Sequence, residues 1–343
     1  MSVGDSSGPL LRAPARAREV PPEHIRLLTK IARMYHERGI RQPQIAAQLN
    51  VSQARVSRLL KQAVELGIVR TIVVSPPGLH ADLEEAIEAK YGLREVVVAD
   101  TGERDEGAAL LPALGAAAAT YLETTLTGGD RIGISSWSST LLATVDAMRP
   151  RPARAAEQVV QVLGGVGAVT AQTHATRLTG RLAQLTGAQA VFLPAPGLVS
   201  SKATLRALLS DPGIEPVFDA YESLTLLLAG IGSLAPSPLL EQSGNAIAME
   251  DQERLRQAGA VGDICLRFFD ETGKHVRTID DRVVGISAEA LRAVPRRVGV
   301  AGGLSKLSAI DAALRGGWVN VLVTDHQVAT RLAEEKLAEG EGA

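Results

Sequence analysis

The sequence contains very little cysteine, few aromatic residues and no long apolar run. Its single cysteine, Cys265, excludes a disulfide within the chain and any metal site built from several cysteines. Aromatic residues make up only 3% of the 343 residues, which argues against a protein that stacks the bases of single-stranded nucleic acid. No run of about 18 apolar residues is present, so we expect no membrane-spanning segment and no membrane partner. These absences are typical of a cytoplasmic protein.

The histidines and the first residues add further expectations. None of the six histidines has the spacing of metal ligands, so we expect neither a metal site nor a cofactor. Residues 1–22 are rich in Pro, Ala, Arg, Ser and Gly, which predicts a disordered tail, and they lack the apolar stretch of a signal peptide. With 45% apolar residues, the chain is long enough for two or three domains with a large core.

The most informative stretch, residues 40–68, is predicted to form two short helices joined by a tight turn at Asn50-Val51. Pro43 suits the first turn of a helix, Ser52 is placed to cap the next one, and Gly67 to end it. The apolar positions of the two helices are Ile45, Ala46, Leu49, Val56, Leu59, Leu60 and Val64, which we expect to be buried. This is the pattern of a helix-turn-helix, whose second helix enters the major groove of DNA.

The charge distribution favours DNA binding over the simpler alternative, a helical hairpin with a solvated charged face. Residues 1–70 carry 12 Lys and Arg against 5 Asp and Glu, a net charge of +7. Residues 71–343 carry 24 against 33, a net charge of −9, so the chain total of −2 hides a basic first segment. A concentrated basic segment is what releases counterions from DNA phosphates.

Individual roles follow from side-chain chemistry. We expect Arg55 and Arg58 to contact base edges, because Arg with guanine is the commonest specific pairing, and Gln53 to read adenine. Ser52, Lys61 and Arg41 are expected to touch phosphates, which position the protein without specifying sequence. The full predicted DNA-binding set is Arg41, Gln44, Ser52, Gln53, Arg55, Ser57, Arg58 and Lys61.

Segments on either side complete a predicted winged helix-turn-helix domain over residues 23–75. Residues 23–38 predict a preceding helix, and residues 68–74 predict a strand, the wing. The apolar face of that first helix would carry Ile25, Leu28, Ile31, Ala32 and Tyr35. Residues 76–92 are predicted to be a linker followed by an oligomerisation helix, with Leu83, Ile87 and Tyr91 on one side.

From residue 93 to residue 338, apolar runs alternate with helical patterns. Such alternation predicts an α/β domain with a doubly wound, mostly parallel sheet, in which ligands bind at the carboxyl ends of the strands. The predicted strands are residues 96–98, 131–134, 159–163, 190–193, 225–229, 298–301 and 319–323. The predicted helices are residues 107–126, 139–148, 172–185, 201–209 and 304–314.

Glycines and hydroxyl residues gather where several of these strands end, which suggests a small-molecule pocket. Alternatives stay open: Ser135–Thr140 also suits a plain helix cap, Lys306 a solvated lysine and Asp263 a turn-forming residue, whereas Arg267 and Asp270 suit a structural hairpin pair. Trp137 occupies the place of the second glycine in a nucleophile elbow, which excludes that motif. The predicted effector-binding set is Ser136, Trp137, Ser138, Ser139, Thr140, Gln161, Gly164, Gly165, Thr173, Gly230, Gly232, Asp263, Gly303 and Lys306.

Several segments together resemble the SorC-type sugar-responsive transcriptional regulators, which are related in fold to sugar-phosphate isomerases and deaminases. The resemblance covers about residues 23–335. Besides the helix-turn-helix, it is carried by residues 93–98, Ser136-Trp137-x-x-Thr140, residues 259–264, Arg267-Phe268-Phe269-Asp270, Ala301-Gly302-Gly303-x-x-Lys306 and Val323-Thr324-Asp325.

The resemblance implies a cytoplasmic homo-oligomer, a dimer or tetramer, that binds operator DNA under the control of a sugar or sugar phosphate. It places the ligand loop on Ser138, Ser139 and Thr140, the acidic contact on Asp263 and the basic contact on Lys306. Two departures weigh against a doubly phosphorylated effector: Ser138 stands where the family often has glycine, and Leu163 where phosphosugar readers can carry a basic residue. A polyol, a free sugar or a monophosphate remains open.

The sequence therefore predicts a regulator of carbohydrate uptake or catabolism and not an enzyme. One rival is a sugar-phosphate isomerase or deaminase with a helical extension, in which Lys306 and Asp263 would do acid–base work. Another is a DNA-architectural protein without a ligand, which would not need a polar pocket.

Overall fold

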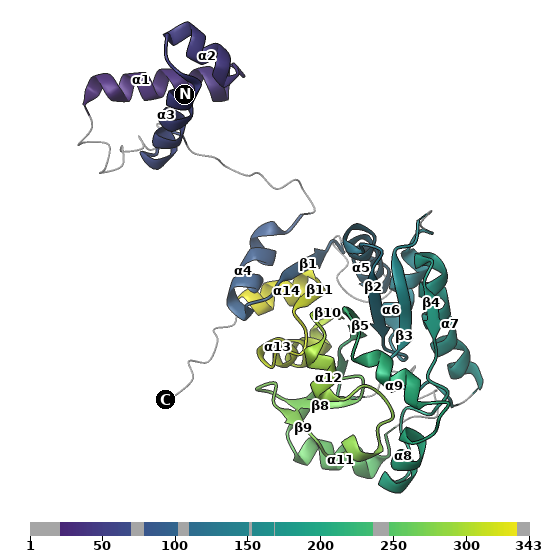
Figure 1. Cartoon of the computed structure of the whole chain (residues 1–343). Helices are drawn as coiled ribbons and strands as arrows, with labels where there is room; N and C mark the ends of the chain where they lie inside the picture. The colour runs from purple at the N-terminus through teal and green to yellow at the C-terminus, as the bar shows by residue number, and fades with distance from the viewer. Residues whose placement is uncertain are drawn as a thin grey trace, which may run out of the picture. The chain divides into compact units, whose positions relative to one another are not determined.

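The computed structural model describes residues 21–69, 79–101, 110–150, 153–167, 169–235 and 247–334; for residues 169–175 it describes the backbone alone. The chain divides into two compact units, residues 1–74 and residues 75–343. We call the described part of the first unit the head and that of the second unit the body, and we treat each by itself (Figure 1).

The head is a bundle of helices around a small apolar core. Its helices are α1 (Pro22–Ala32), the π-helix η2 (Arg33–Glu37), α2 (Gln42–Leu49) and α3 (Gln53–Glu65). The buried side chains are Leu28, Ile31, Ala32, Met34, Ile45, Ala46, Val56, Leu59, Leu60 and Ala63. The predicted first helix and the predicted helix pair are therefore confirmed.

Two predicted core positions of the head are wrong. Tyr35 is 38% exposed, because the change to a π-helix at Arg33 turns Met34 toward the core instead. Val64 is 53% exposed, since the buried stripe of α3 ends at Ala63, seven residues after Val56.

The turn between α2 and α3 has the predicted chemistry. Asn50 adopts the left-handed conformation with a φ of 51°, and the Ser52 hydroxyl accepts a hydrogen bond from the Arg55 N–H at 3.3 Å. Gly67, with a φ of 69°, follows the end of α3. Ile68 and Val69 lie in a bend and not in a strand, and the rest of the predicted wing lies outside the described residues.

The body is built on a seven-stranded, wholly parallel sheet in the order β1-β11-β10-β5-β2-β3-β4. Each of the seven predicted strands is one of them. Their bounds are β1 (Glu95–Ala99), β2 (Asp130–Ile134), β3 (Ala156–Gln161), β4 (Gln189–Val191), β5 (Leu226–Gly230), β10 (Arg296–Val300) and β11 (Val321–Asp325).

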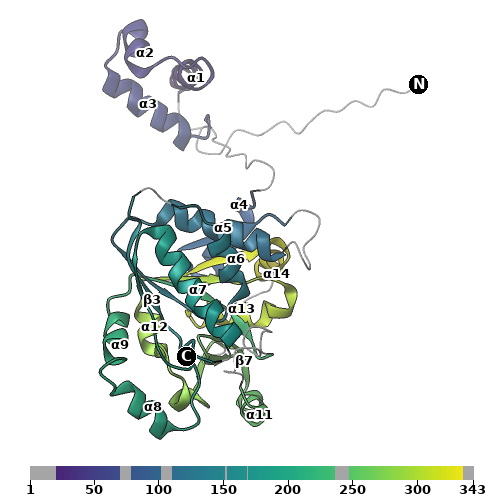
Figure 2. The ribbon, with the colours of Figure 1, turned by 90° about the vertical axis from the view of Figure 1, so that its right-hand side faces the viewer.

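Helices cover both faces of this sheet, which confirms the doubly wound prediction (Figures 1 and 2). One face packs against α5 (Leu110–Thr125), α6 (Ser139–Ala147) and α7 (Val169–Thr186). The other face packs against α4 (Ala81–Tyr91), α9 (Glu215–Tyr221), α12 (Ala288–Ala293), α13 (Leu307–Arg315) and α14 (His326–Glu334). Alternate strand residues serve the two layers: Leu227 and Ala229 lie in one core, Leu226 and Leu228 in the other.

A second, antiparallel sheet that the sequence did not predict as a unit follows in the order β6-β7-β8-β9. Its strands are β6 (Gly232–Ser233), β7 (Ala260–Ile264), β8 (Arg267–Asp270) and β9 (His275–Val276). Shorter helical elements lie in the connections between strands: α8 (Lys202–Leu209), α11 (Met249–Gln257), η4 (Asp280–Arg282) and η5 (Leu304–Lys306). Residues 267–270 form β8, which pairs with β7 as a hairpin, so the prediction of a hairpin there is confirmed. Arg267 does not pair with Asp270, because its guanidinium donates to the Ile286 and Gly285 carbonyls.

Helix α4 belongs to the body. Ile87 is fully buried, and Leu83 and Tyr91 pack against the same core. Its carboxylates also serve the sheet, because Glu84 and Glu88 accept hydrogen bonds from the N–H groups of Val98 and Val96 at 2.9 and 2.8 Å. The side of this helix on which an oligomer contact was expected is therefore occupied within the chain.

Candidate functional site

The outward face of α3 carries the side chains expected to meet DNA. Gln53, Arg55, Ser57, Arg58 and Lys61 are all exposed. The apolar stripe of the helix holds the opposite side in the core of the head, so these five groups point away from it. The arrangement leaves a polar, basic face free for a partner.

The remaining predicted head residues lie around this helix. Arg41 is exposed before α2, and the Gln44 side chain accepts a hydrogen bond from the Arg41 N–H at 3.3 Å. Ser52 caps α3. Gln44 and Ser52 therefore each have a structural role in the head beside any contact with DNA.

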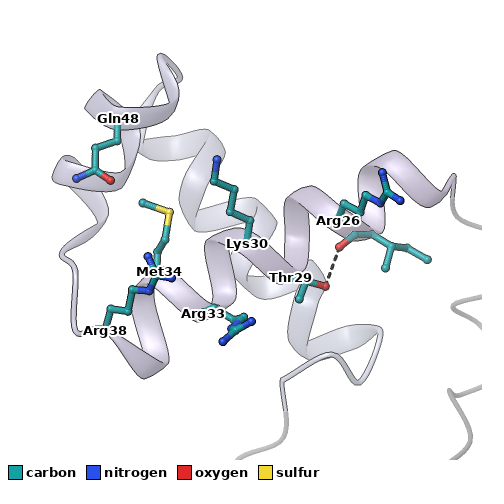
Figure 3. A pocket seen from close by; sticks show the side chains of 8 residues that line it. Arg26, Thr29, Lys30, Arg33, Met34, Arg38 and Gln48 are labelled. Carbon is teal, nitrogen blue, oxygen red and sulfur yellow. Dashed lines mark hydrogen bonds between the residues drawn. The ribbon is translucent and has the colours of Figure 1, made fainter.

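A second basic surface of the head, which sequence reasoning missed, is a groove of about 480 Å³ along α1 and η2 (Figure 3). Four cations line it: Arg26, Lys30, Arg33 and Arg38. Within the described part of the chain only one of them forms an ion pair, Arg33 with Glu37 at 2.8 Å. Side chains four and three residues apart share a helix face, so the i, i+4, i+7 spacing of residues 26, 30 and 33 is the signal that could have found it.

The body contains a cavity of about 510 Å³ at the carboxyl ends of the adjacent strands β2, β5 and β10. The loops after these three strands supply Ser138, Gly230 and Lys306. Of the predicted effector-binding residues, those that line the cavity are Trp137, Ser138, Ser139, Thr140, Gly230, Gly232, Asp263 and Lys306. The sheet therefore brings residues from 137 to 306 into one site, as its topology predicts.

The hydroxyl loop after β2 begins helix α6. Ser138 caps the helix by accepting from the Leu141 N–H at 3.3 Å, and its Oγ lies 2.8 Å from Thr140 Oγ1. Thr140 in turn donates to the Val300 carbonyl at 3.0 Å. A side chain at Gly230 would place a Cβ 2.6 Å from Ser138 Oγ, so glycine there makes room for the Ser138 hydroxyl.

An acid and a base line the cavity, Asp263 from strand β7 and Lys306 from η5. Burial raises the pKa of Asp263 to about 6, although the Leu266 N–H and Lys306 both act to lower it. Burial lowers the pKa of Lys306 from its ordinary value, and Asp263 opposes that change. Lys306 Nζ also donates to the Ile231 carbonyl at 3.1 Å. Gly232 is required beside this pair, because a Cβ there would lie 2.0 Å from Asp263 Oδ1.

Two further features of the cavity suit a bound ligand. Trp137 is only 8% exposed, and its indole N–H has no hydrogen-bond partner among the described residues, which leaves a buried donor to be satisfied. Cys265 and Leu266 form the β7–β8 turn with φ values of 55° and 59°, a conformation that is strained in residues other than glycine. The Asp263 carboxylate holds that turn through the Leu266 N–H at 2.9 Å.

Five of the predicted effector residues that the structure describes do not line the cavity, and a sixth, Thr173, has an undescribed side chain. Ser136 and Gln161 are buried and bonded to each other at 3.1 Å, and both donate to the Leu163 carbonyl. Gly164 packs so closely that a Cβ would lie 2.2 Å from the Pro196 carbonyl oxygen, and Gly165 beside it is buried. Gly303 sits in the loop after β10, and the side chain of Thr173 is outside the described set.

Sequence reasoning missed several residues of this site. The cavity has an apolar wall, which the predicted set of glycine, hydroxyl and charged residues did not indicate. It consists of Leu110, Leu111, Leu114, Ile247 and Phe268. Asp325 lies under the Gly302–Gly303 loop and accepts from the Gly303 N–H at 2.7 Å. Among the described residues no three or more His, Cys, Asp or Glu side chains are placed to hold a metal ion.

Comparisons with known proteins agree with this geometry. Residues 75–334 match the family model described as "Putative sugar-binding domain". The chain is 32% identical to the deoxyribonucleoside regulator of Bacillus subtilis (strain 168), over 91% of this chain and 99% of that protein, and 31% identical to the sorbitol operon regulator of Klebsiella pneumoniae, over 90% and 98%. The crystal structure of the full-length sorbitol operon regulator SorC from Klebsiella pneumoniae superposes with a TM-score of 0.68, at 29% identity, over 91% of this chain and 100% of that one.

This chain belongs to the SorC-type family of sugar-binding transcriptional regulators. A solved domain from Pseudomonas syringae pv. tomato, titled as the sugar-binding domain of a DeoR regulator, is 40% identical over 74% of this chain and 99% of that one, with a TM-score of 0.59. As a member of this family the protein is a sugar-responsive transcriptional regulator. No helix of this SorC-type regulator, within the described residues, is long and apolar enough to cross a membrane.

Proposed function

We propose that the head reads a duplex operator with α3 in the major groove. Arg55 and Arg58 contact base edges, Gln53 reads adenine, and Lys61 with Arg41 holds phosphates. The exposure of all five side chains and the capped start of α3 support these roles. The groove cations of α1 add to the positive field that draws the head to DNA.

The effector of the body is a polyol, a free sugar or a sugar monophosphate. Lys306 is the only cation among the described residues that line the cavity, and a buried carboxylate lies across from it. A second phosphate group would meet Asp263 without a second cation to offset the repulsion. The apolar wall of leucines suits the carbon face of a sugar.

Effector binding changes operator affinity because the ligand binds one arrangement of the protein better than another. The expected coupling is about 1–3 kcal/mol, which corresponds to a change of roughly 5–150-fold in affinity. The protein acts in the cytoplasm as a homo-oligomer on genes of carbohydrate uptake or catabolism. The names of the relatives, a deoxyribonucleoside regulator and a sorbitol operon regulator, support this target class.

The protein performs no catalysis. Asp263 and Lys306 are the ionisable groups on the described cavity wall besides Cys265, and both are committed to backbone partners, the Leu266 N–H and the Ile231 carbonyl. Burial raises the pKa of Cys265 to about 12, so the thiol is not a ready nucleophile. Turnover of sugar phosphates by the purified chain would overturn this assignment in favour of the isomerase or deaminase rival.

The observation that carries the proposal is a single chain with an exposed basic face on α3 and a cavity lined by one lysine and one aspartate, each of which affects the pKa of the other. A thermal-shift screen tests it with sorbitol, 2-deoxyribose, their monophosphates and fructose 1,6-bisphosphate. We expect a neutral or singly phosphorylated compound to raise the melting temperature. At a concentration of 100 times its Kd, the ligand should add about 2.7 kcal/mol to the free energy of unfolding. The matched variant Lys306→Met should lose the shift for monophosphates, and a shift with the bisphosphate alone would contradict the effector class.

A further inference from the structure

One buried carboxylate, Asp325, holds two parts of the body at once. It lies at the end of β11 and is fully buried. Its Oδ2 accepts from the Gly303 N–H at 2.7 Å, and its Oδ1 accepts from the Val328 N–H at 3.1 Å, in the first turn of α14. A Cβ at Gly302 would lie 2.4 Å from Oδ2, so the glycine loop is pressed directly against this carboxylate.

The loop that Asp325 holds belongs to the cavity. Gly302, Ser305 and Lys306 all line it, and Gly303 has a φ of 89° that glycine tolerates and other residues rarely adopt. A ligand that bonds to Lys306 therefore pulls on a loop whose other support is the Asp325 carboxylate. A change in that loop reaches the start of α14 through the same side chain.

The start of α14 touches the point where the chain enters the body. His326, the residue after Asp325, packs against His80 with ring centroids 4.6 Å apart and the ring planes tilted by 53°. His80 is the N-cap residue of α4, and its carbonyl accepts from the Leu83 and Glu84 N–H groups in the first turn of that helix. In sequence, residues 70–79 are all that separates His80 from the described end of the head.

From the first turn onward, α4 is also fixed to the body at several points. Glu84 and Glu88 bond to β1, and Tyr91 donates to Asp311 of α13 at 2.6 Å. Among these described contacts, the one between His80 and His326 lies at the N-cap of α4 and is nearest to the head in sequence. A shift of His326 changes how the first turn of α4 is held, without requiring the rest of the helix to move.

We propose that Asp325 is a positioning residue that couples the cavity to the head: it sets the Gly302–Gly303 loop and, through His326 and His80, the first turn of α4. The inference rests on the proposed function, since the cavity must hold the effector for the route to carry a signal. It assigns to Asp325, His326 and His80 a role in response and not in ligand contact.

Hydrogen–deuterium exchange on the ligand-free, full-length protein tests the route. Asp325→Asn removes one carboxylate acceptor with little change of shape, so exchange in peptides 302–307 and 79–84 should quicken by roughly tenfold. His326→Ala should quicken exchange in peptide 79–84 and leave peptide 302–307 unchanged. The double variant should show no further effect at 79–84, because both changes break the same connection.

Peptide 226–230 of β5 and the surface variant Asp146→Asn are the controls. If Asp325 had a merely structural role, Asp325→Asn would also quicken hydrogen exchange in β5, whereas the proposal expects exchange in β5 to stay unchanged. Asp146 pairs with Arg177 at 2.8 Å on the surface, so Asp146→Asn should change exchange in neither test peptide. Unchanged exchange at 79–84 in either single variant overturns the route, and if Asp325→Asn does not fold, His326→Ala alone decides. The exchange experiment uses no ligand and is therefore independent of the thermal-shift screen. The screen tests the effector hypothesis, and hydrogen exchange tests the connection from Asp325 to α4.

Discussion

Replacing Asp263 by asparagine should remove a pH dependence from the stability of the body. The folded protein raises the pKa of this carboxyl from 3.8 to about 6, chiefly through burial. A raised carboxyl pKa means that the folded state holds the proton more tightly than the unfolded chain. The free energy of unfolding therefore falls as the pH rises from about 4 to about 6, and is level above that. The gap between the two pKa values corresponds to at most about 3 kcal/mol, because solvent in the open cavity screens part of it.

Urea titrations between pH 4.5 and pH 7.5 measure this effect. Both tryptophans, Trp137 and Trp318, lie in the body, so intrinsic fluorescence reports the unfolding of that unit alone. Between pH 4.5 and pH 7.5 the difference in unfolding free energy between the parent and Asp263→Asn should shift against the parent by at most about 2 kcal/mol, because the part of the effect below pH 4.5 lies outside this range. Effects of other titrating groups cancel in the difference, apart from the coupling to Lys306.

A control with the opposite sign is Asp270→Asn. Burial acts to raise the pKa of Asp270, but hydrogen bonds from Thr272 and Lys274 outweigh it and lower the pKa below 3.8. The stability that the ionised Asp270 contributes is therefore lost only as the pH falls below about 4. Its titration should therefore run parallel to that of the parent protein from pH 4.5 to pH 7.5. If Asp263→Asn also runs parallel to the parent, burial does not raise the pKa of Asp263 and the electrostatic reasoning about the cavity is refuted.

Four other changes test the head and the body. Arg58→Ala should weaken specific operator binding by about 1–3 kcal/mol in a titration at fixed salt, and parental affinity would remove Arg58 from the base contacts. Lys306→Ala should abolish the effector response in a DNA-binding assay while leaving ligand-free binding intact; a retained response would reject Lys306 as the effector contact. Ser52→Ala should cost the head about 1 kcal/mol, read by circular dichroism of the head helices, and an unchanged melting curve would deny the cap its role. Gly164→Ala should destabilise the body by about 2 kcal/mol or more, since its Cβ would lie 2.2 Å from the Pro196 carbonyl oxygen, and an unaltered urea midpoint would contradict that packing.

The main sheet was predictable because its strands are buried on both faces and read as continuous apolar runs. Val159 and Leu228 have no exposed surface, so hydrophobicity alone marks their strands. The second sheet was missed as a unit because β6 and β9 are two residues long and the β7–β8 turn uses Cys265 and Leu266 where glycine or asparagine is expected. Because Cys and Leu rarely adopt the left-handed conformation, the sequence contained no sign of a turn at these two residues.

Site residues could be predicted where the signal lies in neighbouring residues of the sequence. They could not be predicted where a side chain bonds to a residue that is distant in sequence. Lys306 and Asp263 stood out beside glycine loops, and the structure brings both to the cavity. Gln161 was expected to contact the effector, but the structure gives its amide to Ser136 and Leu163. Asp325 acts on an N–H group 22 residues away, a relation that only the pairing of β10 with β11 creates.

The two carboxylates of α4 protect one edge of the sheet. Glu84 and Glu88 accept hydrogen bonds from the Val98 and Val96 N–H groups on the free side of β1, a strand at one of the two edges of the sheet. An open strand border of this kind invites a neighbour to add its own strand, which is how many proteins aggregate. Here those two donors are already taken, so a neighbouring molecule cannot use the Val96 and Val98 N–H groups to add a strand beside β1.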